Sequence, residues 1–499
     1  MRNPKKAATC SHLGNIRFRR VNNDYIVTND CGDWACLDQV DFKRLLENSI
    51  TKDEPLYQEL RDKQFIDIDR TDRNKLAEQA SKYLRLHNSA YRGPSLFLII
   101  LTLRCNQRCL YCQSTPETCD THGYDMDEAT AKKALDLIFQ GPSQNVHIEF
   151  QGGEPLLNWP VLQYMVGYSQ NMAEIHKKRL KLTVISNLIL MDDEKLKFLL
   201  DHNVSIVTSL DGPAEVHDKN RPFLGSGKSH AIVVKQIKKI NAAIRQKRKG
   251  SPSQFIDQLN AITTITKFSL PYAKEIIDEY ISLGFNNIFL RPLNPFGLER
   301  KTHKLISYKS EKFITFYKRA LDYILELNSK GTFILERNAF FALSKILKND
   351  DPCFYDMRNP CGASIGQMAF NYDGAIYSCD EGRMSSRMGY GNFQIGHVNT
   401  SRFSDLIDNE VTKTLCISSC LDNQASCSDC AYKPYCGVCP LVNFVEYGNL
   451  FPQIPATDSC KIKMAIFDHL FKKLKNKKIR AVFDDWFRRM AAHLYERSE

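Results

Sequence analysis

Six short apolar runs, separated by amphipathic stretches, constrain the fold of this chain more than any other feature of its sequence. The runs are Leu96–Leu103, Val146–Phe150, Leu182–Ile185, Val204–Leu210, Leu259–Ile265 and Ile288–Leu290. Their length suits strands buried on both faces, whereas Glu128–Phe139, Asp193–Leu200 and Lys274–Leu283 have the periodicity of surface helices. Strand–helix units in series predict a parallel sheet, and six such units predict a partial (β/α)6 TIM-like barrel within an α/β fold.

Two smaller regions flank these units. In residues 1–90, the segments Ile16–Val21 and Tyr25–Thr28 alternate as short strands do, and helical patterns follow near 39–48 and 74–86. They predict a small α+β domain with a winged-helix-like order. We therefore divide the chain into a small N-terminal domain at 1–90, a barrel domain at 91–340, a cysteine-rich domain at 341–465 and a basic helical tail at 466–499.

The chain has 17 cysteines among its 499 residues, and most of them lie in two groups. The first residues are polar and basic, and no stretch approaches roughly 18 uninterrupted apolar residues, so neither secretion nor a membrane span is expected. We expect a cytoplasmic protein. In that compartment grouped cysteines indicate metal binding before disulfides.

The net charge of +11 is concentrated at the two ends of the chain. Residues 1–20 hold six Lys or Arg and no acid, and residues 461–499 hold eleven against five acids. We interpret both ends as solvated surface. Docking of an acidic partner or of nucleic acid is the alternative.

A cysteine loop follows the first apolar run directly. Its spacing is Cys105-x3-Cys109-x2-Cys112. Three thiolates this close can hold three irons of a [4Fe–4S] cube and leave the fourth iron open for a non-protein ligand. The alternatives are a zinc site that lacks its fourth ligand, or unrelated cysteines.

Polar segments follow the next three apolar runs. The second run ends in Gly152-Gly153-Glu154, where the glycines let backbone carbonyls approach a ligand and Glu154 adds negative charge near a cationic amine. The third ends at Ser186-Asn187, and the fourth at Ser209-Leu210-Asp211-Gly212-Pro213, before His217-Asp218 and Arg221. Each segment alone is turn-forming sequence. Because barrel chemistry sits at the carboxyl ends of strands, their shared position predicts one site.

The C-terminal third of the chain holds the second cysteine group. Its members are Cys353, Cys361, Cys379, Cys427, Cys430, Cys436, Cys439 and Cys460, and the spacing from Cys427 to Cys439 is Cys-x2-Cys-x5-Cys-x2-Cys. A zinc ribbon is the alternative for paired Cys-x2-Cys spacings. Eight thiols, however, complete two sites of four thiolates each, which favours iron–sulfur clusters.

The cysteine loop, the Gly-Gly-Glu-Pro segment and the Ser-x-Asp-Gly-Pro segment resemble the radical S-adenosylmethionine (SAM) superfamily over residues 96 to about 295. The resemblance implies that Cys105, Cys109 and Cys112 bind a [4Fe–4S] cluster whose open iron chelates SAM. It further implies that Gly152, Gly153 and Glu154 contact the SAM amino group and that Asn187, Ser209 and Arg221 contact its ribose or carboxylate. One electron then cleaves SAM to methionine and a 5′-deoxyadenosyl radical, which abstracts hydrogen from a substrate carbon.

The order of the C-terminal cysteines resembles the SPASM extension of radical SAM enzymes that modify peptides. It implies two auxiliary [4Fe–4S] clusters, one on Cys353, Cys361, Cys379 and Cys439 and the other on Cys427, Cys430, Cys436 and Cys460. Because the Cys436–Cys439 spacing is one residue shorter than usual, Cys416 and Cys420 are substitute ligands. Asp380, directly after Cys379, is a candidate general base; a solvated or hydrogen-bonded aspartate is the alternative.

Three further segments, Arg17–Arg20, Thr28–Asp33 and Phe289–Gly297, resemble the B-type radical SAM maturases of the His-Xaa-Ser system, so the resemblance covers nearly the whole chain. It implies modification of a peptide or protein substrate with His-Xaa-Ser repeats, alongside a second radical SAM protein and an electron donor of the flavodoxin or ferredoxin type. Residues 1–90 would dock the peptide by adding a strand at a sheet edge.

Two other functions stay open from the sequence. The first is a sulfatase-maturase-like oxidation of a Cys or Ser side chain. The second is a non-catalytic iron–sulfur or zinc scaffold, although a scaffold has no need of the glycine and glutamate segment beside a three-cysteine loop. Neither a membrane nor nucleic acid is expected as a partner.

Overall fold

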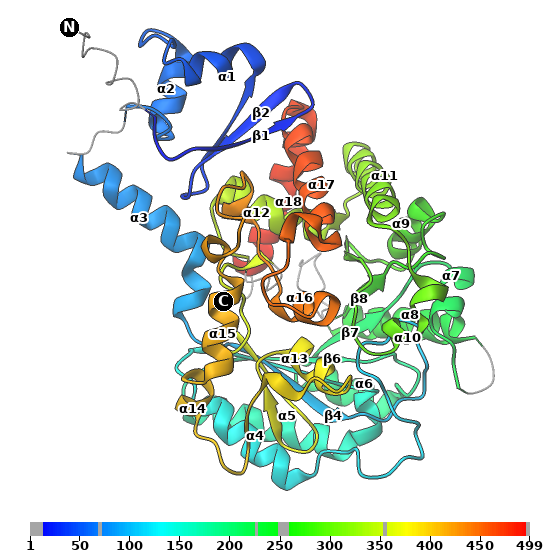
Figure 1. Cartoon of the computed structure of the whole chain (residues 1–499). Helices are drawn as coiled ribbons and strands as arrows, with labels where there is room; N and C mark the ends of the chain where they lie inside the picture. Colours follow the sequence, from blue (N-terminus) through cyan, green and yellow to red (C-terminus); the bar gives the residue numbers. More distant parts are fainter. Residues whose placement is uncertain (1–12, 68–71, 225–227, 248–258, 353–356, 496–499) are drawn as a thin grey trace, which may run out of the picture.

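A nine-stranded sheet in the order β10-β8-β7-β6-β5-β4-β12-β13-β14 forms the centre of the molecule (Figure 1). The computed structural model describes residues 13–67, 72–224, 228–247, 259–352 and 357–495. Six strands are parallel: Leu96–Thr102 (β4), Asn145–Gly152 (β5), Arg179–Ile185 (β6), Ser205–Ser209 (β7), Leu259–Thr264 (β8) and Leu290–Arg291 (β10). Each strand lies on one of the six apolar runs, which confirms the predicted α/β barrel fold.

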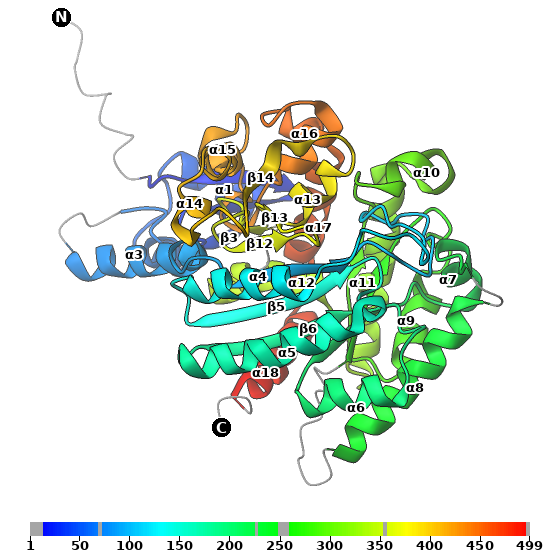
Figure 2. The same ribbon diagram turned by 90° about the horizontal axis from the view of Figure 1, so that it is seen from below.

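Helices connect the parallel strands. They are Glu128–Gln140 (α4), Trp159–Ile175 (α5), Asp193–Asp201 (α6), Ala214–Asn220 (α7), Ser229–Lys247 (α8), Ala273–Ser282 (α9), Leu298–Ile306 (α10) and Ser310–Ser329 (α11). In α4, the Asp127 side chain accepts the Thr130 N–H as a helix cap, and Ala131, Leu135 and Ile138 are buried. Burying each large apolar side chain contributes about 1.5–3 kcal/mol. Figure 2 shows α4 and α5 along one face of the sheet.

The sixth apolar run forms two short strands and not the single predicted one. Asn287–Ile288 (β9) pairs with Leu335–Glu336 (β11), whereas β10 pairs with β8. The Glu336 carboxylate accepts the Leu290 N–H at 3.2 Å. A side chain therefore replaces a neighbouring strand as the hydrogen-bond partner of this backbone group. The run is therefore divided between two sheets.

The C-terminal region extends the barrel sheet beyond β4. Gln367–Phe370 (β12) is parallel to β4, and Ala375–Tyr377 (β13) and Gln394–His397 (β14) follow in antiparallel order. The helices here are Arg337–Lys348 (α12), Asp380–Ser386 (α13), Phe403–Ile407 (α14), Glu410–Ser419 (α15), Pro440–Tyr447 (α16), Asp458–Leu474 (α17) and Lys477–Tyr495 (α18). The sheet thus runs continuously across the domain boundary expected near residue 340.

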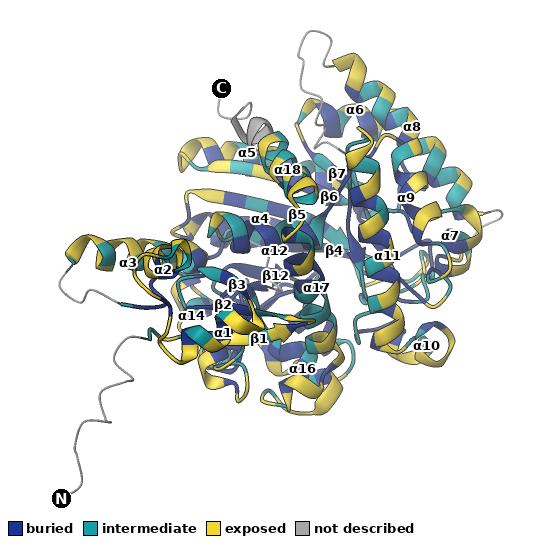
Figure 3. Ribbon diagram, turned by 90° about the horizontal axis from the view of Figure 1, so that it is seen from above, coloured by how far each residue is buried: buried dark blue, intermediate teal, exposed yellow. Residues whose placement is uncertain are grey.

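The region expected to be a basic tail is helical and also part of the main core. Phe483 and Trp486 of α18 are fully buried, and Trp486 Nε1 donates to Asn328 Oδ1 at 3.2 Å. Figure 3 shows the central strands buried and the outer faces of the helices exposed. The helix α18 packs on α11 and α12. No helix in the described part of the chain is long and apolar enough to cross a membrane.

An N-terminal unit with its own sheet precedes the barrel. Its strands Arg17–Val21 (β1), Asp24–Thr28 (β2) and Trp34–Asp38 (β3) are antiparallel, and its helices are Gln39–Leu46 (α1), Pro55–Asp62 (α2) and Arg73–His87 (α3). The predicted α+β pattern lacked β3 and α2. Val27, Leu37, Leu45, Leu60 and Phe65 form a small core separate from that of the barrel.

Candidate functional site

The three cysteines of the first loop lie together at the carboxyl end of β4. The loop is tied to its surroundings by backbone bonds, from Cys105 N–H to Glu117 O at 2.9 Å and from Leu298 N–H to Cys112 O at 2.8 Å. Burial raises the pKa of the Cys105 thiol well above its usual range, and the neighbouring Cys109 adds to the shift. Burial also raises the pKa of Cys109 to about 12. Such thiols ionise when they bind a metal, so the loop suits a cluster.

Polar atoms without partners surround this loop. Among the described residues, Asn106 Nδ2, Gln107 Nε2, Ser114 Oγ and Thr115 Oγ1 are buried and make no hydrogen bond. Leaving a buried donor or acceptor unpaired costs about 1–3 kcal/mol. Their concentration around three thiols fits a polar group bound at the loop, as the resemblance to radical SAM proteins requires for a cluster and SAM.

Glu154 joins the carboxyl ends of β5 and β6. Its carboxylate is fully buried and accepts bonds from the Ser186 hydroxyl and the Asn187 N–H, both at 2.8 Å, and from the Leu156 N–H at 3.1 Å. Burial raises its pKa to about 7. The Asn187 side chain in turn donates to Asn106 Oδ1 at 2.7 Å, so the strand ends and the cysteine loop form one connected site.

Gly152 and Gly153 pack against the backbone of the first strand and loop. A Cβ on Gly152 would lie 2.0 Å from Thr102 O, and one on Gly153 would lie 2.2 Å from Arg104 O. A side chain at Gly153 would therefore collide with the residue before Cys105. Contact of the two glycines with a ligand through their backbone stays a prediction.

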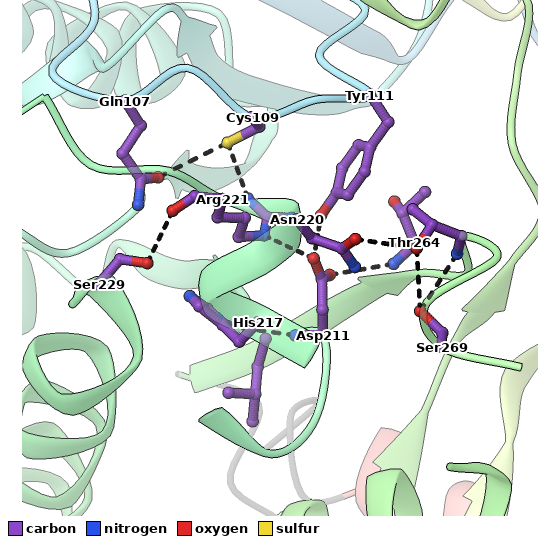
Figure 4. Close-up of polar contacts among 12 residues, drawn as sticks. Gln107, Cys109, Tyr111, Asp211, His217, Asn220, Arg221, Ser229, Thr264 and Ser269 are labelled. Atoms are coloured by element: carbon purple, nitrogen blue, oxygen red, sulfur yellow. Dashed lines mark hydrogen bonds and ion pairs between the residues drawn. The ribbon is translucent and has the colours of Figure 1, made fainter. Parts of the chain in front are cut away.

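Arg221 lies against the cysteine loop in a buried ion pair (Figure 4). Its Nε donates to Asp211 Oδ2 at 3.1 Å, and its Nη1 lies 3.6 Å from Cys109 Sγ. The Tyr111 hydroxyl donates to the same Asp211 oxygen at 2.5 Å. Asp211 belongs to the Ser-x-Asp-Gly-Pro segment, but the sequence predicted no role for it or for Tyr111. Ser209, the last residue of β7, is half-buried.

Asp380 begins α13 directly after Cys379 and forms an ion pair. The Arg383 guanidinium, itself buried, donates to Asp380 Oδ1 at 2.8 Å. The sequence did not single out Glu149 of β5, whose pKa is raised by burial and, more weakly, by the charge of Asp380. The alternation of polar His147, Glu149 and Gln151 with apolar residues on β5 is the signal that could have identified it.

The C-terminal cysteines form two neighbouring groups. Cys361 and Cys379 belong to one cluster of buried side chains, and the partly buried Cys439 packs against it. Burial raises the pKa of Cys379 well above its usual range. Cys427, Cys430, Cys436 and Cys460 line a cavity of about 110 Å³. Cys439 lines that cavity too, so it borders both groups. Cys353 lies outside the described residues.

Cys416 and Cys420, the substitute ligands, lie at the end of α15. They are not among the described residues that line the cavity. Within the described ranges, no three His, Cys, Asp or Glu side chains are arranged to hold a single metal ion. A cube of four irons binds each thiolate to a different iron and so takes more widely spaced ligands than one ion does.

Known proteins similar to this chain include maturases. A cysteine-type anaerobic sulfatase-maturating enzyme of Clostridium novyi (strain NT) is 24% identical over 339 residues, which are 66% of this chain and 83% of that relative. The radical SAM cyclopropyl synthase TigE of Paramaledivibacter caminithermalis is 24% identical over 134 residues, 24% of this chain and 27% of that relative.

Two solved structures share the fold. Native anSMEcpe with bound AdoMet has a TM-score of 0.63 at 16% identity and covers 79% of this chain and 100% of its own. Streptococcus suis SuiB bound to S-adenosylmethionine has a TM-score of 0.52 at 16% identity and covers 90% of this chain and 99% of its own. Residues 99–252 match the Radical SAM superfamily model. The cysteine loop lies inside that segment, so residues 99–252 are similar to the radical SAM superfamily in both sequence and motif.

Proposed function

We propose that this chain modifies a peptide or protein after translation, as a maturase of the His-Xaa-Ser type. The observation that carries the proposal is the meeting of three neighbouring thiols with Glu154 and Asn187, at the carboxyl ends of neighbouring parallel strands, and with Arg221 at the end of α7. A [4Fe–4S] cluster and SAM bound by these residues would supply a 5′-deoxyadenosyl radical that abstracts hydrogen from the substrate.

The residues of the chain would hold and shield that group. Cys105, Cys109 and Cys112 would be its thiolate ligands, and the unpaired Asn106 Nδ2 and Gln107 Nε2 would be donors to it. Gly152, Gly153 and Glu154 would shape the side facing the SAM amine, and Asn187, Ser209 and Arg221 the side facing its ribose or carboxylate. The buried loop residues Cys105, Gln107 and Tyr111 would help to exclude water from that group.

Two carboxyl groups are candidates for proton transfer to and from the substrate. Asp380 would act as general base, with Arg383 holding its orientation. Glu149 is a second candidate, because burial raises the pKa of its carboxyl group and so favours the protonated form that can donate a proton. Both roles require that the substrate binds inside the barrel, within hydrogen-bond distance of the carboxyl group.

The C-terminal thiols would hold two auxiliary [4Fe–4S] clusters. Cys353, Cys361, Cys379 and Cys439 would ligate the first, and Cys427, Cys430, Cys436 and Cys460 the second. The adjacency of Cys361, Cys379 and Cys439 and the cavity lined by the other four thiols support this division. An electron donor of the flavodoxin or ferredoxin type would supply the reducing electron.

A peptide substrate is supported by proteins of the same fold. One anSMEcpe structure contains a Cp18Cys peptide, and one SuiB structure contains its precursor peptide SuiA. The His-Xaa-Ser assignment, with a second radical SAM protein as partner, rests on the sequence segments of this chain. Mass spectrometry of a co-expressed peptide with His-Xaa-Ser repeats should show a mass change that is absent without the enzyme. An unchanged peptide mass would contradict the assignment.

Iron content and SAM cleavage test the underlying chemistry. The anaerobically reconstituted chain should bind about twelve irons, as three cubes require. Replacing Cys105, Cys109 and Cys112 by Ala should remove roughly a third of that iron and all formation of 5′-deoxyadenosine. Stoichiometric zinc with little iron would favour the scaffold alternative.

A sulfatase-maturase-like oxidation of a Cys or Ser side chain is the second candidate. The observation that favours it is the sequence similarity to the Clostridium novyi sulfatase-maturating enzyme over 339 residues. Oxidation of such a side chain to an aldehyde can be detected by labelling with a hydrazide. Incubation with a sulfatase-derived Cys peptide and, separately, with a His-Xaa-Ser peptide would show which substrate the reduced enzyme modifies.

A further inference from the structure

The N-terminal unit bonds directly to the segment between Cys427 and Cys436, which we call the thiol loop (residues 427–436). Thr28 Oγ1 donates to Ala431 O at 2.7 Å, and Arg17 Nε donates to Ser428 O at 2.5 Å. Both acceptors are backbone carbonyls within the loop. Thr28 is fully buried and Arg17 nearly so, so water does not replace these bonds.

A third bond runs in the opposite direction. The Tyr435 hydroxyl donates to Gly32 O at 2.9 Å, and Tyr435 is fully buried. The three bonds hold the thiol loop at its start, middle and end against β1, β2 and the turn that follows β2. In Figure 1 the strands β1 and β2 accordingly lie beside α17, the helix that carries Cys460.

Positive charge from the same strand lies beside the thiol loop. Arg19 of β1 pairs with Asp468 of α17 through bonds of 2.8 and 2.9 Å, and the Tyr432 hydroxyl donates to the same carboxylate at 2.6 Å. The Arg19 guanidinium also lies 5.8 Å from the centre of the Tyr432 ring. Burial raises the pKa of the Cys430 thiol, and the charges of Arg19 and Arg17 oppose that shift.

We propose that the N-terminal unit is a structural and electrostatic part of the second auxiliary site. Thr28 and Arg17 hold the thiol loop, and Arg17 and Arg19 are positioning residues that raise the reduction potential of a cluster on Cys427, Cys430, Cys436 and Cys460. This inference rests on the proposed function, because it requires an iron–sulfur cluster at the second auxiliary site. Reduction adds negative charge to an anionic thiolate-bound cluster, and nearby cations favour that change.

Arg19→Gln and Arg20→Gln form a matched pair for the electrostatic role. Arg20 is the next residue of β1, but it is exposed and donates to Asn22 O at 3.0 Å instead of facing the thiol loop. Both changes are made in chains with Cys105, Cys109 and Cys112 replaced by Ala, which removes the first cluster from the spectra. A further Cys460→Ser chain identifies the signal of the second auxiliary site.

Potentiometric titration followed by electron paramagnetic resonance is the measurement. The midpoint potential of the second auxiliary cluster should become more negative in Arg19→Gln and stay unchanged in Arg20→Gln. Arg19→Lys should recover most of the difference, because it restores the positive charge. An unchanged potential in Arg19→Gln at full iron content would overturn the electrostatic role.

Hydrogen exchange in the metal-free chain tests the holding role without a cluster. Thr28→Val keeps the size of the side chain and removes its hydroxyl. Amide exchange in residues 428–435 should accelerate relative to Arg20→Gln, while exchange in β4 and β5 stays unchanged. Unchanged exchange in the thiol loop would overturn the holding role. Absence of iron from Cys427, Cys430, Cys436 and Cys460 in the unmodified chain would refute the proposed second cluster, and with it the electrostatic role.

Discussion

At the scale of single residues, Gly153 is required by the backbone of the cysteine loop. A methyl group there would lie 2.2 Å from Arg104 O, whereas Gly167 of α5 has no atom within 4 Å of the same position. We expect Gly153→Ala to lower the free energy of unfolding by about 1–3 kcal/mol through overpacking. Gly167→Ala, in a helix interior, should raise it by about 0.5–1 kcal/mol. Denaturant unfolding of both metal-free variants measures the difference.

Iron analysis of the same two variants separates the packing role of Gly153 from a role in SAM binding alone. Because the collision involves the residue before Cys105, Gly153→Ala should lose iron from the first loop as well as SAM binding. Gly167→Ala should retain both. Full iron content with weakened SAM binding in Gly153→Ala would instead support the original expectation of a ligand beside this glycine.

The buried pair of Arg221 and Asp211 gives a second prediction at this scale. Arg221→Met leaves the Asp211 carboxylate buried without its cation, which should cost about 3–5 kcal/mol of unfolding free energy. Because the hydrogen bonds from Tyr111 and Thr264 to Asp211 remain, we expect the loss of unfolding free energy to lie near the lower end of this range. Adding Asp211→Asn should recover part of it. Unfolding free energies of the four proteins form a double-mutant cycle, and a coupling near zero would contradict the pairing.

Spacing and strand-end position identify individual site residues better than they identify their partners. The thiols of Cys105, Cys109 and Cys112 lie together as their spacing indicates, because a short loop allows no other arrangement. The contact of Arg221 with Cys109 joins residues 112 positions apart. No local sequence pattern shows such a contact, and none shows the electrostatic effect of Asp380 on Glu149.

At the scale of elements, β5 makes a pH-dependent contribution to stability. His147 is bonded through its ring to Thr183 of β6 at 2.9 Å, and burial lowers its pKa from 6.5 to about 3, with a further effect of Lys181. The unfolded chain therefore takes up this proton near pH 6.5, but the folded chain does so only near pH 3. This contribution is present above about pH 6.5 and is lost as the pH falls toward 3.

Exchanging His147 tests that contribution. Between pH 7.5 and 5, the difference in proton uptake amounts to about 2 kcal/mol of unfolding free energy. His147→Gln keeps a polar partner for Thr183 and should make stability less dependent on pH by that amount, whereas exposed His122→Gln should not. Urea unfolding of the metal-free proteins at the two pH values provides the comparison. Equal pH dependence in His147→Gln and the unmodified chain would contradict the burial of this ring.

Apolar periodicity predicted the long elements and missed the short ones. The barrel strands β4 to β8 and the helices α4, α6 and α9 follow from runs of apolar residues long enough to show a period. The strands β9, β10 and β11 contain two residues each, which is too few for a period. The sheet extension from β4 to β12 joins segments that no local signal connects.

At the scale of the whole molecule, the two ends of the chain pack against each other and not as separate appendages. Trp34 of β3 contacts the Phe471 ring of α17 at 5.3 Å between centres and donates to Ile346 O of α12 at 3.2 Å. Lys475 pairs with Asp24 at 2.6 Å. The composition of the two ends shows only that both are basic. It could not predict these contacts, because they are made by apolar side chains and by one ion pair.

Deletion of residues 1–90 therefore tests the organisation of the whole chain. It would remove the donors to Ser428 O and Ala431 O and expose Tyr435 and Phe471. We expect the truncated chain to lose the iron of the second auxiliary site, roughly a third of the total, and to aggregate. Deletion of residues 1–12 alone, ahead of β1, is the control and should leave the iron content unchanged. A soluble truncated chain with full iron content would instead support a separable docking domain.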